Sequence, residues 1–337
     1  MDERKLKILT AVVDEYIITG EPVGSKAIMS HIKASSATIR NEMAELEKQG
    51  YLEQPHTSAG RVPTYKGYRL YVDSLMEQDP LTDEEKTRLD AMLPDDFITE
   101  EDLVEHASLA LAELTKCATV VANSTLKFSL ISKVEVIPTG KRMYVILMIT
   151  SNGAIKNKVC RLEFDLTHEQ LEFFDNFVRE NLNGVPLSEL SDSYIEKLSE
   201  AMGTYMMSLS PLVSELVKMT KEMGDGIIIN GQSNLLTCKD FNQNEIISFL
   251  DNQKELRNFI DGTFSGLNVM FSHEKDGFVI HNSSIITSPF SKDGHTAGAL
   301  GLIGPMRLDY AKFIPYLEYF TKRISDMLSD NDGEDDT

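Results

Sequence analysis

Four polar residues within six positions of one predicted helix have the chemistry to contact the edges of DNA bases. They are Ser36, Thr38, Arg40 and Asn41. A guanidinium can donate two parallel hydrogen bonds to guanine, and a carboxamide can pair in the same way with adenine. Side chains in the first turns of a recognition helix are the ones that reach base edges in the major groove. The same residue types are also ordinary on a solvated helix surface, so their meaning depends on the elements around them.

The helix that carries these side chains is indicated by its apolar spacing. Ile39, Met43 and Leu46 recur at intervals of four and three residues, which gives one narrow apolar stripe. Ser35 or Ser36 can accept hydrogen bonds from the free backbone amides of the first turn. The sequence therefore predicts a half-buried amphipathic helix whose polar face is available to DNA.

Two preceding elements are expected to hold this helix in place. An apolar stripe that ends before Gly20 and Pro22 predicts a helix over residues 3–19. A short second helix is predicted over residues 24–32, and residues 33–34 form a brief turn before the polar helix. Two helices joined by such a turn make a helix-turn-helix, which is typical of DNA-binding domains.

A short hairpin with a polar tip is predicted after Gly50. Residues 51–53 form its first strand and residues 62–63 its return. The loop between the strands contains His56, Thr57, Ser58, Gly60 and Arg61. Such a loop suits a phosphate backbone or a narrow minor groove, and Arg61 could insert into the groove or contact a phosphate. Lys66 follows the hairpin, and we expect it to contact phosphate without regard to base sequence.

The charge distribution predicts a local and modest attraction to DNA. The whole chain has a net charge of -20, whereas residues 1–78 contain 10 Lys and Arg against 11 Asp and Glu. Within residues 24–69, seven basic residues face four acidic ones, and all four acidic residues lie beyond the first turn of the polar helix. We therefore expect weak long-range attraction, with affinity that depends on two copies of the domain acting together.

The rest of the chain mixes helical and strand patterns, which predicts an α+β fold with several domains. Helices are predicted at residues 65–76, 100–122, 167–183, 188–208, 211–223, 244–260 and 309–328. Strands are predicted at residues 130–137, 143–150, 155–164, 227–230, 235–238, around 269, 284–288 and 296–303, with hairpin turns at 139–140 and 152–153. The block of helices in the middle interrupts a domain built on a sheet.

Three long stretches of this sequence resemble the HrcA-type heat-inducible transcription repressors of bacteria. They read GEPVGSKAI, SSATIRNEMAELEKQGYLEQPHTSAGRVPTYKGYRLYVDSLM and LGLIGPMRLDYAKFI. The first two cover most of residues 20–76, and the third spans residues 300–314. The resemblance implies an N-terminal winged helix-turn-helix and a GAF-like α/β domain that carries an inserted, mostly helical dimerisation domain.

The resemblance also implies a function and partners. A homodimer would bind double-stranded DNA at an inverted-repeat operator, the CIRCE element, and repress class I heat-shock operons that encode chaperones. Heat, or a shortage of the GroE chaperonin that keeps the repressor active, would release it. A dimer with two-fold symmetry matches an operator that is an inverted repeat.

The order of elements gives expected limits for these domains. They are a winged helix domain at 1–76, a connector at 77–99, a discontinuous GAF-like domain at 100–164 and 264–329, an inserted dimerisation domain at 165–263 and a disordered acidic tail at 330–337. Five methionines of the insertion could form an adaptable dimer surface or fill a core. They are Met202, Met206, Met207, Met219 and Met223.

No recognisable catalytic or metal-binding motif occurs in the sequence. Cys117, Cys160 and Cys238 lie far apart, and the seven histidines include no pair at ligand spacing. The charged N-terminus lacks a following apolar stretch, and the longest apolar run, residues 144–149, is too short to span a bilayer. We therefore expect no catalysis, cofactor, metal or membrane partner, and a cytoplasmic location.

Gly298, Gly301 and Gly304 form a G-x-x-G-x-x-G pattern inside a predicted apolar strand. A dinucleotide-binding loop has its glycines after the strand, so we expect close backbone packing here instead of a phosphate site.

The main alternative to a repressor controlled by heat is a sensor whose GAF-like domain binds a small effector. An enzyme with an attached DNA-binding domain is more remote because the motifs are missing.

Overall fold

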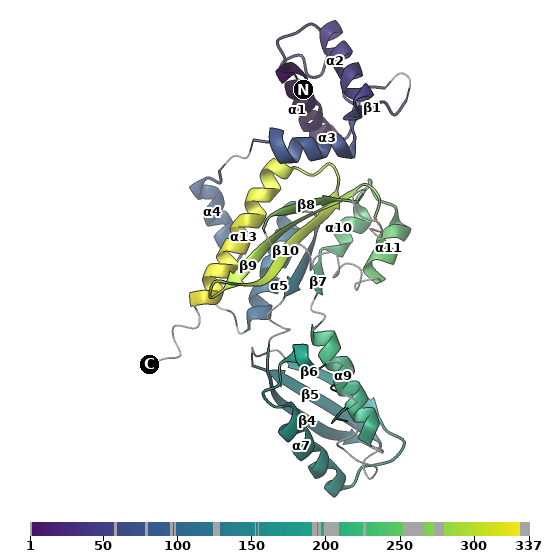
Figure 1. The fold of residues 1–337 in the computed structure, drawn as a ribbon, viewed down its shortest axis with the longest axis vertical. Coiled ribbons are helices and arrows are strands. Elements are labelled where there is room, and N and C mark those ends of the chain that lie inside the picture. Colours follow the sequence, from purple (N-terminus) through teal and green to yellow (C-terminus); the bar gives the residue numbers. More distant parts are fainter. Residues whose placement is uncertain are drawn as a thin grey trace.

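The computed structural model describes residues 2–56, 59–77, 80–94, 97, 99–123, 129–151, 153, 155–190, 194, 197–198, 209–224, 227–251, 266–272 and 280–330. These residues form three bodies stacked along the long axis of the molecule (Figure 1). We call them the head (2–77), the central domain (80–123 and 227–330) and the distal domain (129–224). Helices and strands are mixed, which confirms the predicted α+β class.

The head contains the elements that were predicted to contact DNA. They are α1 (Glu3–Thr19), α2 (Ser36–Lys48), β1 (Leu52–Glu53), β2 (Val62–Pro63), α3 (Tyr65–Leu70) and the π-helical turn η1 (Tyr71–Leu75). α1 ends at Gly20, whose φ of 67° allows its N–H to bond the Tyr16 carbonyl. The apolar stripe of α2 (Ile39, Met43 and Leu46) is buried. The predicted helix over residues 3–19 and the buried stripe are both confirmed.

The predicted helix over residues 24–32 is wrong. This segment forms a series of turns closed by bonds between residues three apart, such as Ala27 N–H to the Gly24 carbonyl at 3.0 Å. Ile28 and Ile32 are nevertheless buried in the head core. The apolar pattern located the buried side chains, but so short a segment can bury them without the costly first turn of an α-helix.

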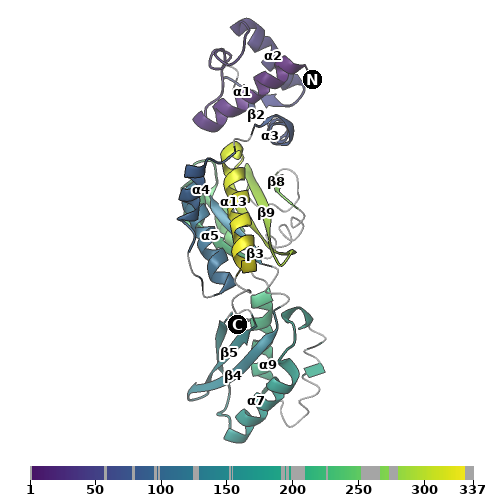
Figure 2. The same cartoon turned by 90° about the vertical axis from the view of Figure 1, so that its left-hand side faces the viewer.

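The central domain is built on a five-stranded antiparallel sheet with the order β7-β3-β10-β9-β8. Its strands are β3 (Ala118–Asn123), β7 (Ile227–Asn230), β8 (Asn268–Phe271), β9 (Ser283–Lys292) and β10 (His295–Pro305). Helices cover both faces of the sheet, and Figure 2 shows the helices of one of these faces side by side. α5 (Glu100–Thr115) and α13 (Tyr310–Asp330) lie against the face that buries Val121. α10 (Gln232–Thr237) and α11 (Gln243–Asp251) pack against the face that buries Val120, and α4 (Asp83–Asp90) lies beside α13.

The three glycines of β10 lie where neighbouring atoms leave no room for a side chain. A Cβ at Gly301 would lie 2.9 Å from Val120 Cγ1. A Cβ at Gly298 would overlap the Phe290 ring, and one at Gly304 would lie 3.0 Å from a cysteine sulfur. The expectation of close packing in this strand is therefore confirmed.

The distal domain has its own sheet and its own core. Its sheet has the order β4-β5-β6 and consists of β4 (Ile131–Gly140), β5 (Met143–Thr150) and β6 (Ile155–Arg161). The described part of this domain also contains α7 (His168–Leu182), α9 (Ser210–Gly224) and the short 3-10 turn η2 (Leu187–Glu189). Ile146 and Met148 of the sheet are buried with Phe174 of α7 and Leu212 of α9. The two helices therefore cover one face of the sheet.

The predicted limits of the insertion, residues 165 and 263, do not match the sheets. The sequence places β4 to β6 in the GAF-like sheet, but among the described strands they pair only with one another. β7 was assigned to the insertion, but it pairs with β3, with Ile229 opposite Val120. The chain therefore leaves the central sheet after β3 and returns at β7. Alternating polarity identifies strands but not their partners, which here are separated by the whole distal domain.

Several other predicted boundaries are also corrected. The predicted helix 100–122 ends at Thr115 because Lys116 turns the chain with a φ of 54°, and β3 follows. Residues 235–238, predicted as a strand, belong mainly to α10. The turn predicted at residues 139–140 lies at residues 141–142. Periodicity alone cannot tell whether a short apolar run of about four to eight residues forms a strand or part of a buried helix.

Some predictions fall outside the described residues. These are most of the predicted helix 188–208, the second half of 244–260, the tail at 331–337, Met202, Met206, Met207 and the side chain of Met223. Met219 is buried in the distal core, which favours core filling for that residue. Within the described residues, no helix combines the length and apolar composition that a membrane crossing requires.

The head is packed firmly against the central domain. Tyr68 of α3 lies between Phe271 of β8 and Tyr310 of α13, with ring centroids 6.3 Å from each. The Nη2 of Arg69 donates a hydrogen bond of 2.8 Å to the main-chain carbonyl of Val269. The orientation of the head therefore depends on contacts with the central sheet.

Candidate nucleic-acid interface

The hydroxyl groups at the start of α2 shape the helix itself. Ser35 Oγ accepts a hydrogen bond from the Thr38 amide at 3.1 Å and lies 2.9 Å from the Thr38 hydroxyl. Ser36 Oγ lies 2.9 Å from Ser25 Oγ, which ties the preceding turns to the helix. Ser35 is therefore the N-cap, and the exposure of Ser35 and Ala37 leaves the positive end of the helix dipole accessible to solvent.

Arg40 and Asn41 are the polar side chains of this end that point into solvent. Both residues are exposed. Neither forms a side-chain hydrogen bond or ion pair with any residue in the part of the chain that the structure describes. Both side chains are therefore free to bind bases, as the sequence suggested.

Most other cations of the head are bound to carboxylates. Arg4 and Lys5 approach Glu42, Lys7 pairs with Glu3, Lys48 with Glu45, Arg61 with Glu47 and Arg69 with Asp73. Lys26 and Lys33 differ, because each is exposed and has no ion pair among the described residues. Together with Arg40, they leave uncompensated positive charge around the start of α2.

Lys26 and Lys33 were missed as candidate contacts, although the sequence contains a signal for them. No Asp or Glu occurs between Glu21 and Glu42. A cation in this stretch has no acidic neighbour along the chain, so its charge is available to a phosphate. The residue types that contact bases do not reveal this pattern, because it consists in the absence of acidic residues from the stretch.

The hairpin is anchored to the segment that follows α1. β1 and β2 pair antiparallel, with Leu52 opposite Pro63. Val23 and Arg61 exchange backbone hydrogen bonds of 2.8 and 2.9 Å. His56 is exposed near the tip of the loop, whereas residues 57–58 (Thr57 and Ser58) lie outside the described part of the chain. The base of the loop thus has a fixed position beside α2.

Arg61 and Lys66 are occupied by contacts within the head. The Nε and Nη2 of Arg61 each lie 2.9 Å from Glu47 Oε2, and the Arg61 side chain is only 18% exposed. The Nζ of Lys66 donates to the Gln49 carbonyl at 3.0 Å and lies 4.4 Å from the centroid of the Tyr51 ring. A contact between either cation and DNA requires these bonds to open. Both lie toward the C-terminal end of α2, away from Arg40.

The described residues offer no alternative site for metal chemistry. They contain no group of three or more His, Cys, Asp or Glu side chains that could hold a metal ion. The feature of the head that stands out chemically is its free cations around one end of an exposed helix. Such an end can approach an anionic polymer.

Comparison with known proteins identifies the family. Residues 101–314 match the family model described as the HrcA protein C-terminal domain. The chain belongs to the HrcA family. Relatives named heat-inducible transcription repressor HrcA come from Clostridium botulinum (strain Eklund 17B / Type B), at 34% identity over 98% of each chain, and from Acetivibrio thermocellus, at 32% identity over 99% of this chain and 98% of that one. This HrcA family member is accordingly a transcription repressor and not an enzyme.

A solved structure has the same fold. The crystal structure of a hypothetical protein matches 98% of this HrcA family chain and 99% of its own length, with a TM-score of 0.66 and 22% sequence identity. At this level of identity the likeness concerns the arrangement of elements alone. It supports the stacking of head, central domain and distal domain in one chain.

Proposed function

We propose that this repressor binds its operator with the N-terminal end of α2 in the major groove. The observation that carries the proposal is the uncompensated charge of Lys26, Lys33 and Arg40 beside the exposed Asn41. Arg40 and Asn41 would bind base edges, and the two lysines would bind phosphates. The caps and turns formed by Ser35, Ser36 and Thr38 would position them.

The head would act as a winged helix domain. In this proposal α1, the turns at residues 25–31 and α2 form the helix-turn-helix, and the β1–β2 hairpin forms the wing. The loop residues His56, Thr57 and Ser58 would contact the DNA backbone or the minor groove. Arg61 and Lys66 would join them only after release from their partners in the head.

Dimerisation would occur through the distal domain. The face of its sheet opposite α7 and α9 carries a cross-strand row of Ile137, Val145 and Val159. The side chains of Ile155 and Val159 on β6 are 61% and 59% exposed. A contiguous apolar face of this kind usually marks an interface, and a second copy related by a two-fold axis would bury it. Two heads related by the same axis would fit an inverted repeat such as CIRCE.

The regulated genes would be the class I heat-shock operons that encode chaperones. In the cytoplasm, the central domain, proposed to be GAF-like, would keep the heads in a binding arrangement. Heat would weaken the contacts between head and central domain, because the net stability of folded domains is only about 5 to 15 kcal/mol. The GroE chaperonin would return the chain to its active form, so a shortage of chaperonin would relieve repression.

Operator binding by the purified full chain tests this function. Fluorescence anisotropy with an inverted-repeat CIRCE duplex would be measured before and after mild heating, with and without GroE. We expect binding that heat abolishes and GroE restores. Arg40→Ala should lose about 1–3 kcal/mol of binding free energy and discriminate less between base sequences. Arg88→Ala, which removes an exposed arginine of α4, is the matched control and should bind normally. Failure to bind the inverted repeat under every condition would overturn the proposal.

A further inference from the structure

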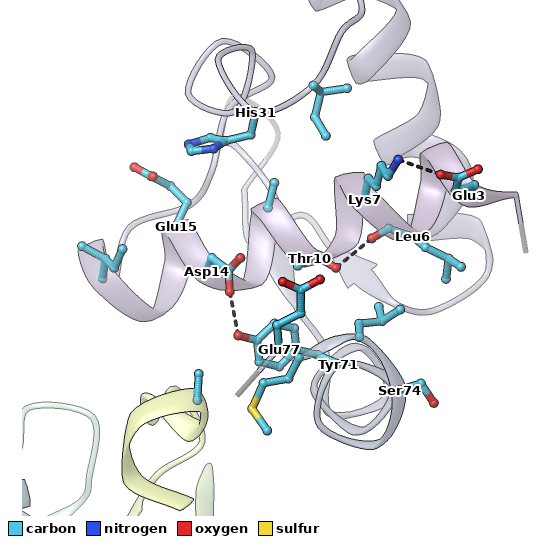
Figure 3. Close-up of a pocket in the computed structure, with 16 residues that line it drawn as sticks. Glu3, Leu6, Lys7, Thr10, Asp14, Glu15, His31, Tyr71, Ser74 and Glu77 are labelled. Carbon is cyan, nitrogen blue, oxygen red and sulfur yellow. Dashed lines mark hydrogen bonds and ion pairs between the residues drawn. The ribbon is translucent and has the colours of Figure 1, made fainter. Parts of the chain in front are cut away.

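A groove runs along the face of α1 that does not pack on α2 (Figure 3). It has a volume of about 610 Å³. Every third or fourth residue of α1 from Glu3 to Ile18 lines it. At the helical rise of 1.5 Å per residue this length is about 22 Å, or four turns. The opposite walls come from Ile32 and from Leu75 in η1, and Ala311 of α13 also lines the groove. Its length and shape suit a second helix lying along α1.

The groove exposes apolar surface. Ile18 is 80% exposed, which is the largest exposure of any large apolar residue in the described chain. Leu6 and Leu75 are partly buried and line the same groove. A partner that covers these side chains would remove their surface from water, which favours association.

The rim of the groove is acidic. Asp14, Glu15 and Glu77 lie on its lining, and the Asp14 carboxylate accepts a hydrogen bond of 2.6 Å from the Tyr71 hydroxyl (Figure 3). The one lysine of the lining, Lys7, is held by Glu3 at 2.6 Å, so it does not neutralise these three carboxylates. The groove therefore presents negative charge around an apolar floor.

This charge excludes two possible occupants. DNA phosphates would be repelled, and the free cations of the head lie instead around the start of α2. Two copies of the same acidic face would also repel each other, which disfavours direct pairing of heads through α1. The partner that complements this groove is therefore one that is both apolar and positively charged.

We propose that the α1 groove binds a cationic amphipathic helix of another protein. The apolar side of that helix would cover Leu6, Ile18 and Leu75, and its Lys or Arg residues would pair with Glu15 and Glu77. Laying an amphipathic helix in an apolar groove is a common mode of recognition between proteins. Because Ala311 belongs to the central domain, the bound helix contacts the head and the central domain together. Its binding is thereby coupled to the orientation of the head.

A designed peptide tests the groove with the full chain. The probe is a fluorescein-labelled helix of about 18 Leu and Lys residues with one apolar face, which is about 27 Å long. A scrambled peptide of the same composition lacks that face. We expect saturable binding of the amphipathic peptide in fluorescence anisotropy, at least about tenfold tighter than that of the scrambled one. Equal binding of the two peptides would overturn the proposal, because charge alone would then explain it.

Two pairs of variants locate the binding. Ile18→Ser should weaken the peptide about tenfold, whereas Ile247→Ser on α11, where Ile247 is 52% exposed, should not. Glu15→Gln should weaken it about threefold, whereas Glu84→Gln on the exposed face of α4 should not. If Ile18→Ser bound the peptide with unchanged affinity, the groove would be excluded as the binding site. Operator binding is a separate readout that Ile18→Ser should leave intact, so failure of the groove and failure of the DNA-binding proposal are distinguishable.

Discussion

The ring centroids of Tyr68 and Tyr310 lie 6.3 Å apart, with the rings tilted by 57°, across the contact between the head and the central domain, but only one of the two hydroxyl groups has a hydrogen-bond partner among the described residues. Tyr310 donates to the Met306 carbonyl and lies 3.0 Å from the Ser284 hydroxyl. The Tyr68 hydroxyl is buried and has no hydrogen-bond partner among the described residues. The hydroxyl of Tyr310 is therefore bonded within the central domain, and the contact with Tyr68 of the head is made by the two rings.

Removal of each hydroxyl should have opposite effects on stability. Tyr310→Phe leaves buried acceptors without their donor, so we expect the free energy of unfolding to fall by about 1–3 kcal/mol. Tyr68→Phe removes an unsatisfied polar group and keeps the ring, so we expect no loss and a gain of up to about 1 kcal/mol. Urea unfolding followed by circular dichroism measures both. Equal destabilisation by the two substitutions would contradict the hydrogen-bond assignment.

Local features of the head were predictable because each depends on neighbours in the chain. The limits of α1 followed from its apolar stripe and Gly20, and the buried stripe of α2 followed from its spacing. The pairing of Arg61 with Glu47 was not predictable, since the two residues are 14 positions apart and meet only because the hairpin folds back on α2. The sequence shows which residues are charged. It does not show which of the cations remain without an acidic partner after folding.

The organisation of the two sheets could not be predicted from the sequence, because it too depends on contacts between residues far apart in the chain. The strand patterns of β4 to β6 and of β7 were recognised, but their partners were not. β3 was hidden because its apolar residues continue the pattern of α5, and the break at Lys116 depends on a positive φ that lysine rarely adopts. Without β3, the sheet that receives β7 could not be placed, and the insertion was shifted toward the C-terminus.

The Cys117 thiol should make stability depend on pH in the alkaline range. Burial raises its pKa to about 12, although a hydrogen bond with Thr115 acts in the opposite direction. An unfolded cysteine titrates near 8.5, so between about pH 9 and 12 the folded state keeps a proton that the unfolded state has lost. The free energy of unfolding should therefore fall as pH rises, by at most about 1.4 kcal/mol per unit from this group.

Cys117→Ala isolates this contribution. The variant should be less stable than the natural chain at pH 8 because it loses buried atoms, but its stability should fall less steeply toward pH 10. Urea unfolding at several pH values gives the slope of the unfolding free energy against pH for each of the two proteins. Tyrosines whose raised pKa does not depend on Cys117 contribute equally to both proteins and cancel in the comparison, whereas Tyr310 is an exception because Cys117 helps to raise its pKa. Parallel slopes would show that the thiol is not held neutral by its surroundings.

The proposed dimer can be tested at the open face of the distal sheet. Val159→Asp places a charge at the β6 end of the apolar row, where association would bury it without a partner. Because Val159 is 59% exposed in the single chain, the fold should tolerate the change. We expect sedimentation equilibrium to show a dimer for the natural chain and a monomer for Val159→Asp. Ile247→Asp on α11 is the control and should remain dimeric, and a dimeric Val159→Asp would exclude this face as the interface.

The ion pair between Arg61 and Glu47 predicts a substitution that strengthens DNA binding. Glu47→Gln removes the carboxylate that neutralises Arg61, so the guanidinium can turn toward DNA at lower cost. If Arg61 contacts the operator, affinity should rise about threefold to tenfold and the dependence of affinity on salt should steepen by about one unit of slope. Arg61→Ala in the same background should cancel both effects. Anisotropy titrations at several salt concentrations measure them.

A matched control separates this effect from a general loss of negative charge. Glu53→Gln changes the net charge equally on the exposed side of β1 but releases no cation, so it should raise affinity only slightly. Equal gains from Glu47→Gln and Glu53→Gln would mean that Arg61 stays in place when DNA binds. If Glu47→Gln raises the affinity for DNA more than Glu53→Gln does, duplexes with A·T-rich and G·C-rich flanks distinguish how Arg61 contacts DNA. A larger gain on A·T-rich flanks indicates insertion into a narrow minor groove, and equal gains indicate a phosphate contact.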